Sequence, residues 1–165
     1  MKAFREYVVS HKEKGEKLLS RLEMAGLLFT MLALVLMLKK IPFSGYFFIL
    51  GLSALTAVYL SLGIFCKEFF GLSETDFFSK ALTGAYLALS FTTLGILFLI
   101  MRWPAARLLT EGGFAATLLF FLFFTYRLYL VKTDEKYKII MHNLIVRMLP
   151  VLITIGILII IQLKS

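Results

Sequence analysis

The sequence predicts an all-α fold: a polytopic integral membrane helix bundle with about five transmembrane helices and two parallel-repeat helical hairpins. Of the 165 residues, 60% are hydrophobic and 17% are charged, whereas an average soluble domain has roughly 45–50% apolar and about 25% charged residues. The apolar residues form blocks that approach or exceed the roughly 20 residues needed to cross a hydrocarbon core about 30 Å thick. The blocks lack the alternating polarity of barrel strands, so helices are the expected spanning form.

Residues 1–23 are predicted to form a cytoplasmic amphipathic segment, because apolar residues recur partly at helical spacing among many charged ones. A first transmembrane hairpin is expected over 24–66, with spans at about 24–38 and 46–65. The first span is short, and Lys39 and Lys40 complete it by directing their ammonium groups towards the lipid headgroups.

The next segment, 67–80, is expected to be a cytoplasmic loop, and residues 73–76 within it read as a loop or a helix cap. Its polar composition contrasts with the apolar block that follows. A second transmembrane hairpin is expected over 81–131, with spans at about 81–101 and 112–130.

A second cytoplasmic amphipathic segment is predicted over 132–147, where apolar residues recur on one helical side. It is expected to lead directly into a C-terminal transmembrane helix at 148–165, with a span of about 148–163. Pro150 then falls in the first turn of that span, where its missing N–H is tolerated.

Lysine and arginine are distributed unevenly between the two sides of this topology. If the N-terminus is cytoplasmic, 13 of the 18 basic residues fall in cytoplasmic segments and 5 fall on the opposite side. The positive-inside rule therefore predicts a multi-pass protein of the inner (cytoplasmic) membrane with a cytoplasmic N-terminus.

The chain matches itself when it is shifted by 62 residues. Pro42 then falls on Pro104 and Lys40 on Arg102, so each unit is two spans joined by a basic, proline-containing turn, and the two units cross the membrane in the same sense. Proline ends one helix and starts the next, and Trp103 marks headgroup depth, so we expect these turn residues at one interface. Further matches are Gly51 with Gly113, Ala54 with Ala116, Phe29 with Phe91, and Thr30 with Thr92.

Arg107 and Glu111 are spaced for an i,i+4 ion pair on one helical face. Glu111 lies seven residues after Pro104, roughly 10 Å along a helix, which is deep enough to carry it below the headgroups. An intramembrane carboxylate indicates an ion or proton pathway. The alternative interpretation, favoured by the nearby arginine, is a structural pair at the hairpin tip.

Small residues recur at every fourth position in three of the predicted spans. Such rows let helix backbones approach closely in lipid, where packing replaces the hydrophobic driving force. We therefore expect a compact bundle that also contacts other membrane subunits or copies of itself. The predicted helix-packing residues are Ser53, Ala57, Ser61, Gly84, Ala88, Gly112 and Ala116.

A turn composed of a basic, an apolar, a proline and a small residue occurs twice, and the first copy is followed by "LGL". The residues of this pattern are Lys40, Ile41, Pro42, Ser44, Gly45, Leu50, Gly51, Leu52, Arg102, Trp103, Pro104, Ala105, Ala106 and Gly113. The pattern resembles the two-span hairpin of the GldL-like membrane family of Bacteroidetes, which has an H-W-P-G-A turn. In that family the hairpin belongs to the proton-driven stator of gliding motility and type IX secretion, and a carboxylate in its second helix is implicated in proton use. The family's acidic position falls here on Leu55 and Thr117, so the resemblance implies a bacterial scaffold without the motor chemistry.

Motifs for metal, nucleotide or nucleophile chemistry are missing from the sequence, which has no H-E-x-x-H, paired cysteines, G-x-S-x-G or P-loop. Cys66 is the only cysteine, which excludes an intrachain disulfide. His11 and His142 lie in charged segments and are interpreted as solvated. The basic residues do not gather on one face, which argues against nucleic-acid binding. We expect no catalytic residue, metal or cofactor.

Three functions are compatible with these features, in decreasing order of preference. The first is a non-enzymatic integral membrane scaffold or subunit of a larger inner-membrane assembly, with the lipid bilayer and other membrane subunits or a homo-oligomer as partners. The second is an oligomeric channel or small ion or solute carrier, with Tyr86, Thr92, Thr93 and Glu111 lining a path. The third is a membrane enzyme acting on lipid, for which no pair of nucleophile and base is visible.

Overall fold

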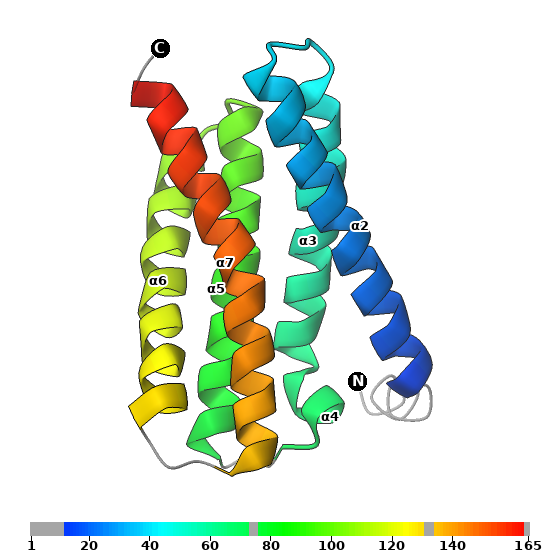
Figure 1. The fold of residues 1–165 in the computed structure, drawn as a ribbon, viewed down its shortest axis with the longest axis vertical. Helices are drawn as coiled ribbons and strands as arrows, with labels where there is room; N and C mark the ends of the chain where they lie inside the picture. The colour runs from blue at the N-terminus through cyan, green and yellow to red at the C-terminus, as the bar shows by residue number, and fades with distance from the viewer. Residues whose placement is uncertain (1–11, 73–75, 131–133, 164–165) are drawn as a thin grey trace.

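The chain folds into a helical bundle, seen here in a computed structural model that describes residues 12–72, 76–130 and 134–163 (Figure 1). Five of its helices are long and apolar enough to cross a membrane, and no strand occurs in the described residues. The prediction of an all-α bundle of about five membrane-spanning helices is confirmed. The helices are α2 (Lys12–Leu38), α3 (Ser44–Ile64), α4 (Cys66–Phe70), α5 (Phe77–Ile100), α6 (Ala106–Leu130) and α7 (Glu135–Leu163).

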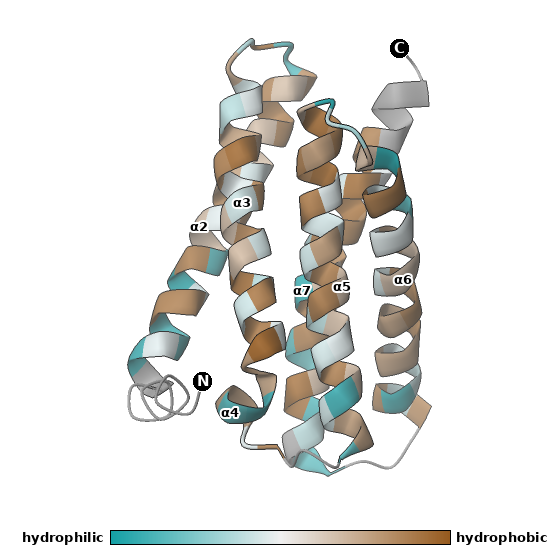
Figure 2. Cartoon of the chain, turned by 180° about the vertical axis from the view of Figure 1, so that it is seen from behind, coloured by the Kyte–Doolittle hydropathy of each residue, from teal (hydrophilic) through white to brown (hydrophobic). Residues whose placement is uncertain are grey.

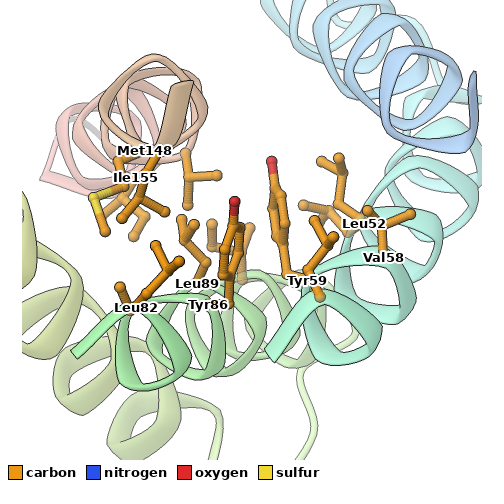
Figure 3. Close-up of a cluster of buried hydrophobic side chains, with 14 of the residues drawn as sticks. Leu52, Val58, Tyr59, Leu82, Tyr86, Leu89, Met148 and Ile155 are labelled. Atoms are coloured by element: carbon orange, nitrogen blue, oxygen red, sulfur yellow. The ribbon is translucent and has the colours of Figure 1, made fainter. Parts of the chain in front are cut away.

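The five long helices form two antiparallel hairpins and one additional helix, and the short α4 follows the first hairpin. Helices α2 and α3 form the first hairpin, α5 and α6 form the second, and α3 packs against α5 to join them. Helix α7 packs on α6 and α5. A view along the bundle shows α2 and α7 on the same side of the central pair α3 and α5, so these two outer helices face each other over that side (Figure 3).

Hydrophilic residues gather towards the two ends of the bundle, whereas apolar residues cover most of the helices between them (Figure 2). Both hairpin turns lie at one end, and α4 lies at the other (Figure 1). This distribution fits a multi-pass membrane protein whose apolar belt contacts the hydrocarbon of the bilayer.

Several elements extend beyond the spans that the sequence predicts. Residues 12–23 belong to the same helix as the first span, so the prediction of a separate amphipathic segment is wrong for this part, and residues 1–11 lie outside the described residues. The predicted segment 132–147 likewise continues without interruption into the last span from residue 135. Its apolar face is covered by neighbouring helices rather than by the membrane surface, since Met141 and Leu144 are fully buried. Pro150 therefore lies inside α7 and not in the first turn of a helix.

The predicted loop at 67–80 is also more ordered than expected. It contains the short helix α4 and the first residues of α5. Asp76 caps α5, because its side chain accepts a hydrogen bond from the backbone N–H of Phe78 at 3.0 Å. Residues 73–75 lie outside the described part of the chain.

The two hairpin turns begin with the same backbone geometry and differ after the proline, where Ala105 has a φ of 63° and the equivalent Phe43 a φ of −85°. Lys40 has a φ of 56° and Arg102 a φ of 55°, and each lies just after the end of its helix. In both turns the N–H of this residue donates to the carbonyl three residues back, and the next N–H donates to the carbonyl five residues back, over 2.9–3.2 Å. This is the Schellman arrangement, which satisfies the last carbonyls of a helix. Pro42 and Pro104 then occupy the second position beyond, where a helix cannot continue.

Each hairpin is closed by a glycine that contacts a threonine. A Cβ added to Gly51 would lie 2.6 Å from Thr30 Oγ1, and one added to Gly113 would lie 2.8 Å from Thr92 Oγ1. Both threonines donate to the carbonyl four residues earlier, at 2.8 Å and 2.7 Å. The glycine and the threonine of the second hairpin are the positions that the self-match of the sequence pairs with those of the first. Thr154 in α7 continues the threonine series at the same interval, and it donates in the same way to the carbonyl of Pro150 at 2.7 Å.

Candidate functional site: a polar cluster inside the bundle

The predicted ion pair between Arg107 and Glu111 lies on the outside of the bundle. Arg107 Nε is 2.9 Å from Glu111 Oε1. The two side chains are 90% and 69% exposed, and they belong to the first two turns of α6, next to the hairpin turn. Such a pair needs no counter-charge from the rest of the protein, and its carboxylate does not reach the bundle interior.

The other turn residues lie at the same end of the bundle (Figure 1). Lys40, Pro42, Arg102 and Pro104 are exposed. Trp103 is half-exposed, and its ring meets that of Phe98 edge-on at a centroid distance of 4.8 Å. This placement suits an interfacial anchor.

The predicted small-residue rows divide between the interior and the surface. Gly84 and Ala88 lie inside, with Gly84 directly against the ring of Phe120. Ala116 is half-buried at an outer groove between α5 and α6. The remaining four do not pack within the bundle core, since they are exposed or, for Ser61, partly exposed: Ser53, Ala57, Ser61 and Gly112.

The closest helix contacts are made by other glycines. Gly95 contacts the α6 backbone, where an added Cβ would lie 2.6 Å from the Thr110 nitrogen. Gly26 contacts Leu55 and the carbonyl of Gly51 in the same way. Gly51 and Gly113 carried a sequence signal through the self-match, whereas Gly26 and Gly95 stand outside the four-residue rows.

The strongest polar feature of the interior is a cluster of four side chains from four helices, namely Glu23 in α2, Tyr59 in α3, Tyr86 in α5 and Arg147 in α7. Arg147 Nε lies 2.9 Å from Glu23 Oε1, and these side chains are 25% and 9% exposed. Arg147 Nη1 donates to the Tyr86 hydroxyl at 2.7 Å, and its guanidinium carbon lies 5.8 Å from the centre of the Tyr86 ring. The arginine therefore connects α2 with α5 and α7.

The two tyrosines of this cluster are fully buried. Their hydroxyl oxygens point the same way, out of the α3–α5 pair and towards the space between α2 and α7 (Figure 3). The Tyr59 hydroxyl has no hydrogen-bond partner among the described residues, and Glu23 Oε1 faces Arg147 Nε at 2.9 Å without an aligned hydrogen bond. The two charges of the cluster are thus paired, while the Tyr59 hydroxyl makes no hydrogen bond within the described residues.

The cluster lies at membrane depth. Glu23, Tyr59 and Tyr86 each lie roughly four helical turns from the hairpin end of their helix. At 1.5 Å per residue these positions are about 21–23 Å from the turns, within a hydrocarbon core of about 30 Å. Burying either charge alone there is costly, and mutual pairing removes most of that cost.

A narrow groove lies on the side of the cluster that faces the hairpin turns, and its nearest lining residues are about one helical turn from the cluster. It runs between α2 and α7 over the α3–α5 pair, and its volume accessible to water is about 10 Å³, roughly that of one water molecule. Thr93 in this groove exchanges a hydrogen bond of 2.9 Å with Thr56, which joins α5 to α3. The groove is lined by Leu27, Thr30, Met31, Leu52, Leu55, Thr93, Ile96, Pro150, Val151 and Thr154.

Sequence reasoning missed this cluster. Glu23 was assigned to the end of the amphipathic segment and Arg147 to the cytoplasmic basic residues, so the two were never considered as partners. A signal was present, because they are separated by twice the period of the self-match, and the equivalent position of α5 holds the small, fully buried Ala85.

The described residues contain no group of three or more histidine, cysteine, aspartate or glutamate side chains that would hold a metal ion. No protein-family model, curated protein or solved structure matches the chain. The site is therefore interpreted from its own chemistry. A paired carboxylate and guanidinium flanked by two hydroxyls can tie helices together, and it can exchange a proton or an ion only if the pair separates.

Proposed function

We propose that the chain is a non-enzymatic scaffold or subunit of a larger inner-membrane assembly, with its N-terminus in the cytoplasm. The observation that carries this proposal is the Glu23–Arg147 pair. Its two charges join α2 to α7, two helices that belong to no common hairpin and face each other beside the central pair (Figure 3). Side-chain hydrogen bonds between helices have the same effect, as for Thr92 and Thr117 at 2.8 Å.

The outer surface of α3 supports an assembly role. Ser53 and Ala57 are exposed although small residues favour close helix contact. Within the described residues no other helix covers them, so this face is available to another membrane helix. The partner is another subunit or a second copy of the chain.

Purification in a mild detergent, followed by mass measurement of whatever elutes with the protein, tests this proposal. An associated subunit or a defined homo-oligomer is expected, and Ala57→Phe should dissociate it. Ala115→Phe provides a matched control, because Ala115 is exposed on α6. A monomer without partners, or an assembly that tolerates Ala57→Phe, would contradict the proposal.

An ion or solute carrier is the second candidate, and the same buried pair favours it. Charged groups inside a membrane protein commonly mark ion or proton pathways, and the small groove between α2 and α7 lies about one helical turn from the pair. Flux into liposomes that is lost in Glu23→Gln and kept in Glu111→Gln would favour the carrier over the scaffold. Glu111 serves as the control because its side chain is 69% exposed.

We further propose that the two hairpins are copies of one ancestral unit and that α7 is a third copy of its first helix. The threonines at positions 30, 92 and 154, each bonded to the carbonyl four residues earlier, support this proposal. Exchanging the helix-ending segments 39–42 and 101–104 should preserve folding, because Lys40 and Arg102 have the same φ and both segments make the same backbone hydrogen bonds. A misfolded exchange variant would count against a common origin.

The likeness to the GldL-like hairpin belongs to this proposal as well. Leu55 and Thr117, which align with the family's acidic position, are buried, and Thr117 is bonded to Thr92. Neither supplies a proton-carrying group in the second helix of its hairpin. The proposal therefore extends to the hairpin scaffold and not to the proton chemistry of the motor.

A further inference from the structure

An apolar groove lies on the outer side of the second hairpin, between α5 and α6. Its volume is about 320 Å³, and its surface is almost entirely carbon. It lies in the half of the hairpin next to α4 and away from the turns. The groove is lined by Phe77, Ala81, Ala116, Leu119, Phe120 and Phe123.

The groove exists because small residues lie between large rings. Phe77 and Phe123 meet edge-on at a centroid distance of 6.2 Å, and the ring of Phe120 sits against Gly84. Ala81 and Ala116 leave the space between these rings unfilled. The groove is therefore a product of the packing of α5 on α6 and does not require a movement to form.

An apolar groove at this depth excludes water, so its occupant is a lipid chain or a protein segment. The groove is short, since Ala116 to Phe123 covers about 10 Å of helix. Phe77 and Leu119 project from its rims and are 66% and 69% exposed. These rims keep a helix, which is about 10–12 Å wide with its side chains, from approaching the floor. An acyl chain is thin enough to enter.

Two basic residues lie at the end of the groove that is farther from the hairpin turns. Arg127 is one helical turn beyond Phe123 on the same face of α6, and Lys80 lies between Phe77 and Ala81 on α5. Counted from the hairpin ends of their helices, both are about 30 Å away, which is the thickness of the hydrocarbon core. In the described part of the chain, neither has an acidic side chain as an ion-pair partner.

We propose that this groove binds one acyl chain of an anionic glycerophospholipid, whose phosphate is held by Arg127 and Lys80. The apolar walls select a chain, and the two cations at headgroup depth select negative charge. Basic pockets beside membrane helices commonly recognise lipid headgroups in this way. The site is separate from the polar cluster and does not depend on the proposed scaffold role.

The test uses the full chain purified in a mild detergent. Phosphatidylglycerol and phosphatidylcholine with identical acyl chains are added. Native mass spectrometry counts the bound lipid molecules, and the rise in melting temperature measures how strongly each lipid stabilises the protein. Phosphatidylglycerol is expected to bind more tightly, by about fivefold for each basic contact. Glycerol phosphate, which has the charge and no chain, should not bind measurably.

Variants separate the contributions of charge and shape. Arg127→Gln with Lys80→Gln should abolish the preference for phosphatidylglycerol, whereas Ala116→Phe should reduce the binding of both lipids. Controls are Arg102→Gln, at the opposite end of the bundle, and Ala115→Phe, on the exposed face of α6.

Three results would overturn the proposal. The first is equal binding of the two lipids to the unmodified chain, and the second is a preference that survives removal of both charges. The third is a dimer that dissociates in Ala116→Phe, because this would show that a second copy of the chain occupies the groove.

Discussion

Replacing Arg147 by Met should destabilise the protein strongly, because the buried Glu23 carboxyl would lose its counter-charge. The Glu23 side chain is only 9% exposed, so the full cost of breaking a buried pair applies, about 3–5 kcal/mol. Glu23→Leu should cost less, about 2 kcal/mol, because Arg147 is 25% exposed and keeps its contact with Tyr86. Replacing both together should cost about 1 kcal/mol or less, since apolar groups of similar volume often substitute for a buried ion pair without loss.

The free energy of unfolding can be measured by titrating SDS into mild-detergent micelles and following the far-ultraviolet circular dichroism. The four proteins of this cycle should give a coupling energy of at least about 4 kcal/mol, which is the sum of the two single effects minus the effect of the double replacement. Arg107→Met and Glu111→Leu form a matched cycle on an exposed i,i+4 pair, where the coupling should stay below about 0.5 kcal/mol. A coupling between Glu23 and Arg147 as small as that of the exposed pair would refute the interpretation of this cluster as a tie between α2 and α7.

Three further predictions concern packing, backbone conformation and the thiol. Gly113→Ala should lower the unfolding free energy by about 1–3 kcal/mol, because its Cβ would lie 2.8 Å from an α5 backbone nitrogen. Gly112→Ala should leave the unfolding free energy unchanged, because nothing lies within 4 Å of its added Cβ. Equal effects of the two substitutions would contradict this prediction. Ala105→Gly should raise the unfolding free energy by up to about 1 kcal/mol, because Ala105 has a φ of 63°. The control Ala115→Gly, on the exposed face of α6, should lower it by about 1 kcal/mol. A decrease at both positions would show that Ala105 is unstrained. Burial raises the pKa of the Cys66 thiol to about 11, so the thiol stays protonated at neutral pH. The rate of its alkylation by iodoacetamide should therefore rise about tenfold per pH unit up to about pH 11. A plateau of this rate near pH 9 would contradict the prediction.

The sequence was sufficient to predict the fold class and the hairpins. Five apolar blocks and two prolines define the spans and turns, because membrane thickness and the missing proline N–H act locally along the chain. The same local reasoning failed at the helix ends. Charged residues such as those between 12 and 23 read as a surface segment, yet the helix continues through them and packs on α3.

The candidate site was missed for a different reason. Glu23 and Arg147 lie in different predicted elements, and only the packing of α2 and α7 on the same side of the central helices brings them together. The sequence predicts the pairing of Glu111 because its partner is one helical turn away, but an i,i+4 pair forms equally well on an exposed helix surface. Pairing across a bundle depends on which faces of the helices meet, and hydropathy carries little information about that.

The pair of Glu23 and Arg147 has a consequence for the biosynthesis of the protein. Arg147 is added 124 residues after Glu23, which at about 5–20 residues per second corresponds to about 6–25 s of translation. Throughout this interval the nascent carboxylate lacks the Arg147 guanidinium with which it pairs in the folded bundle. We therefore expect the first helix to stay shallow, with Glu23 among the lipid headgroups or held by the insertion machinery, and to move to its final depth only after the last helix has left the ribosome.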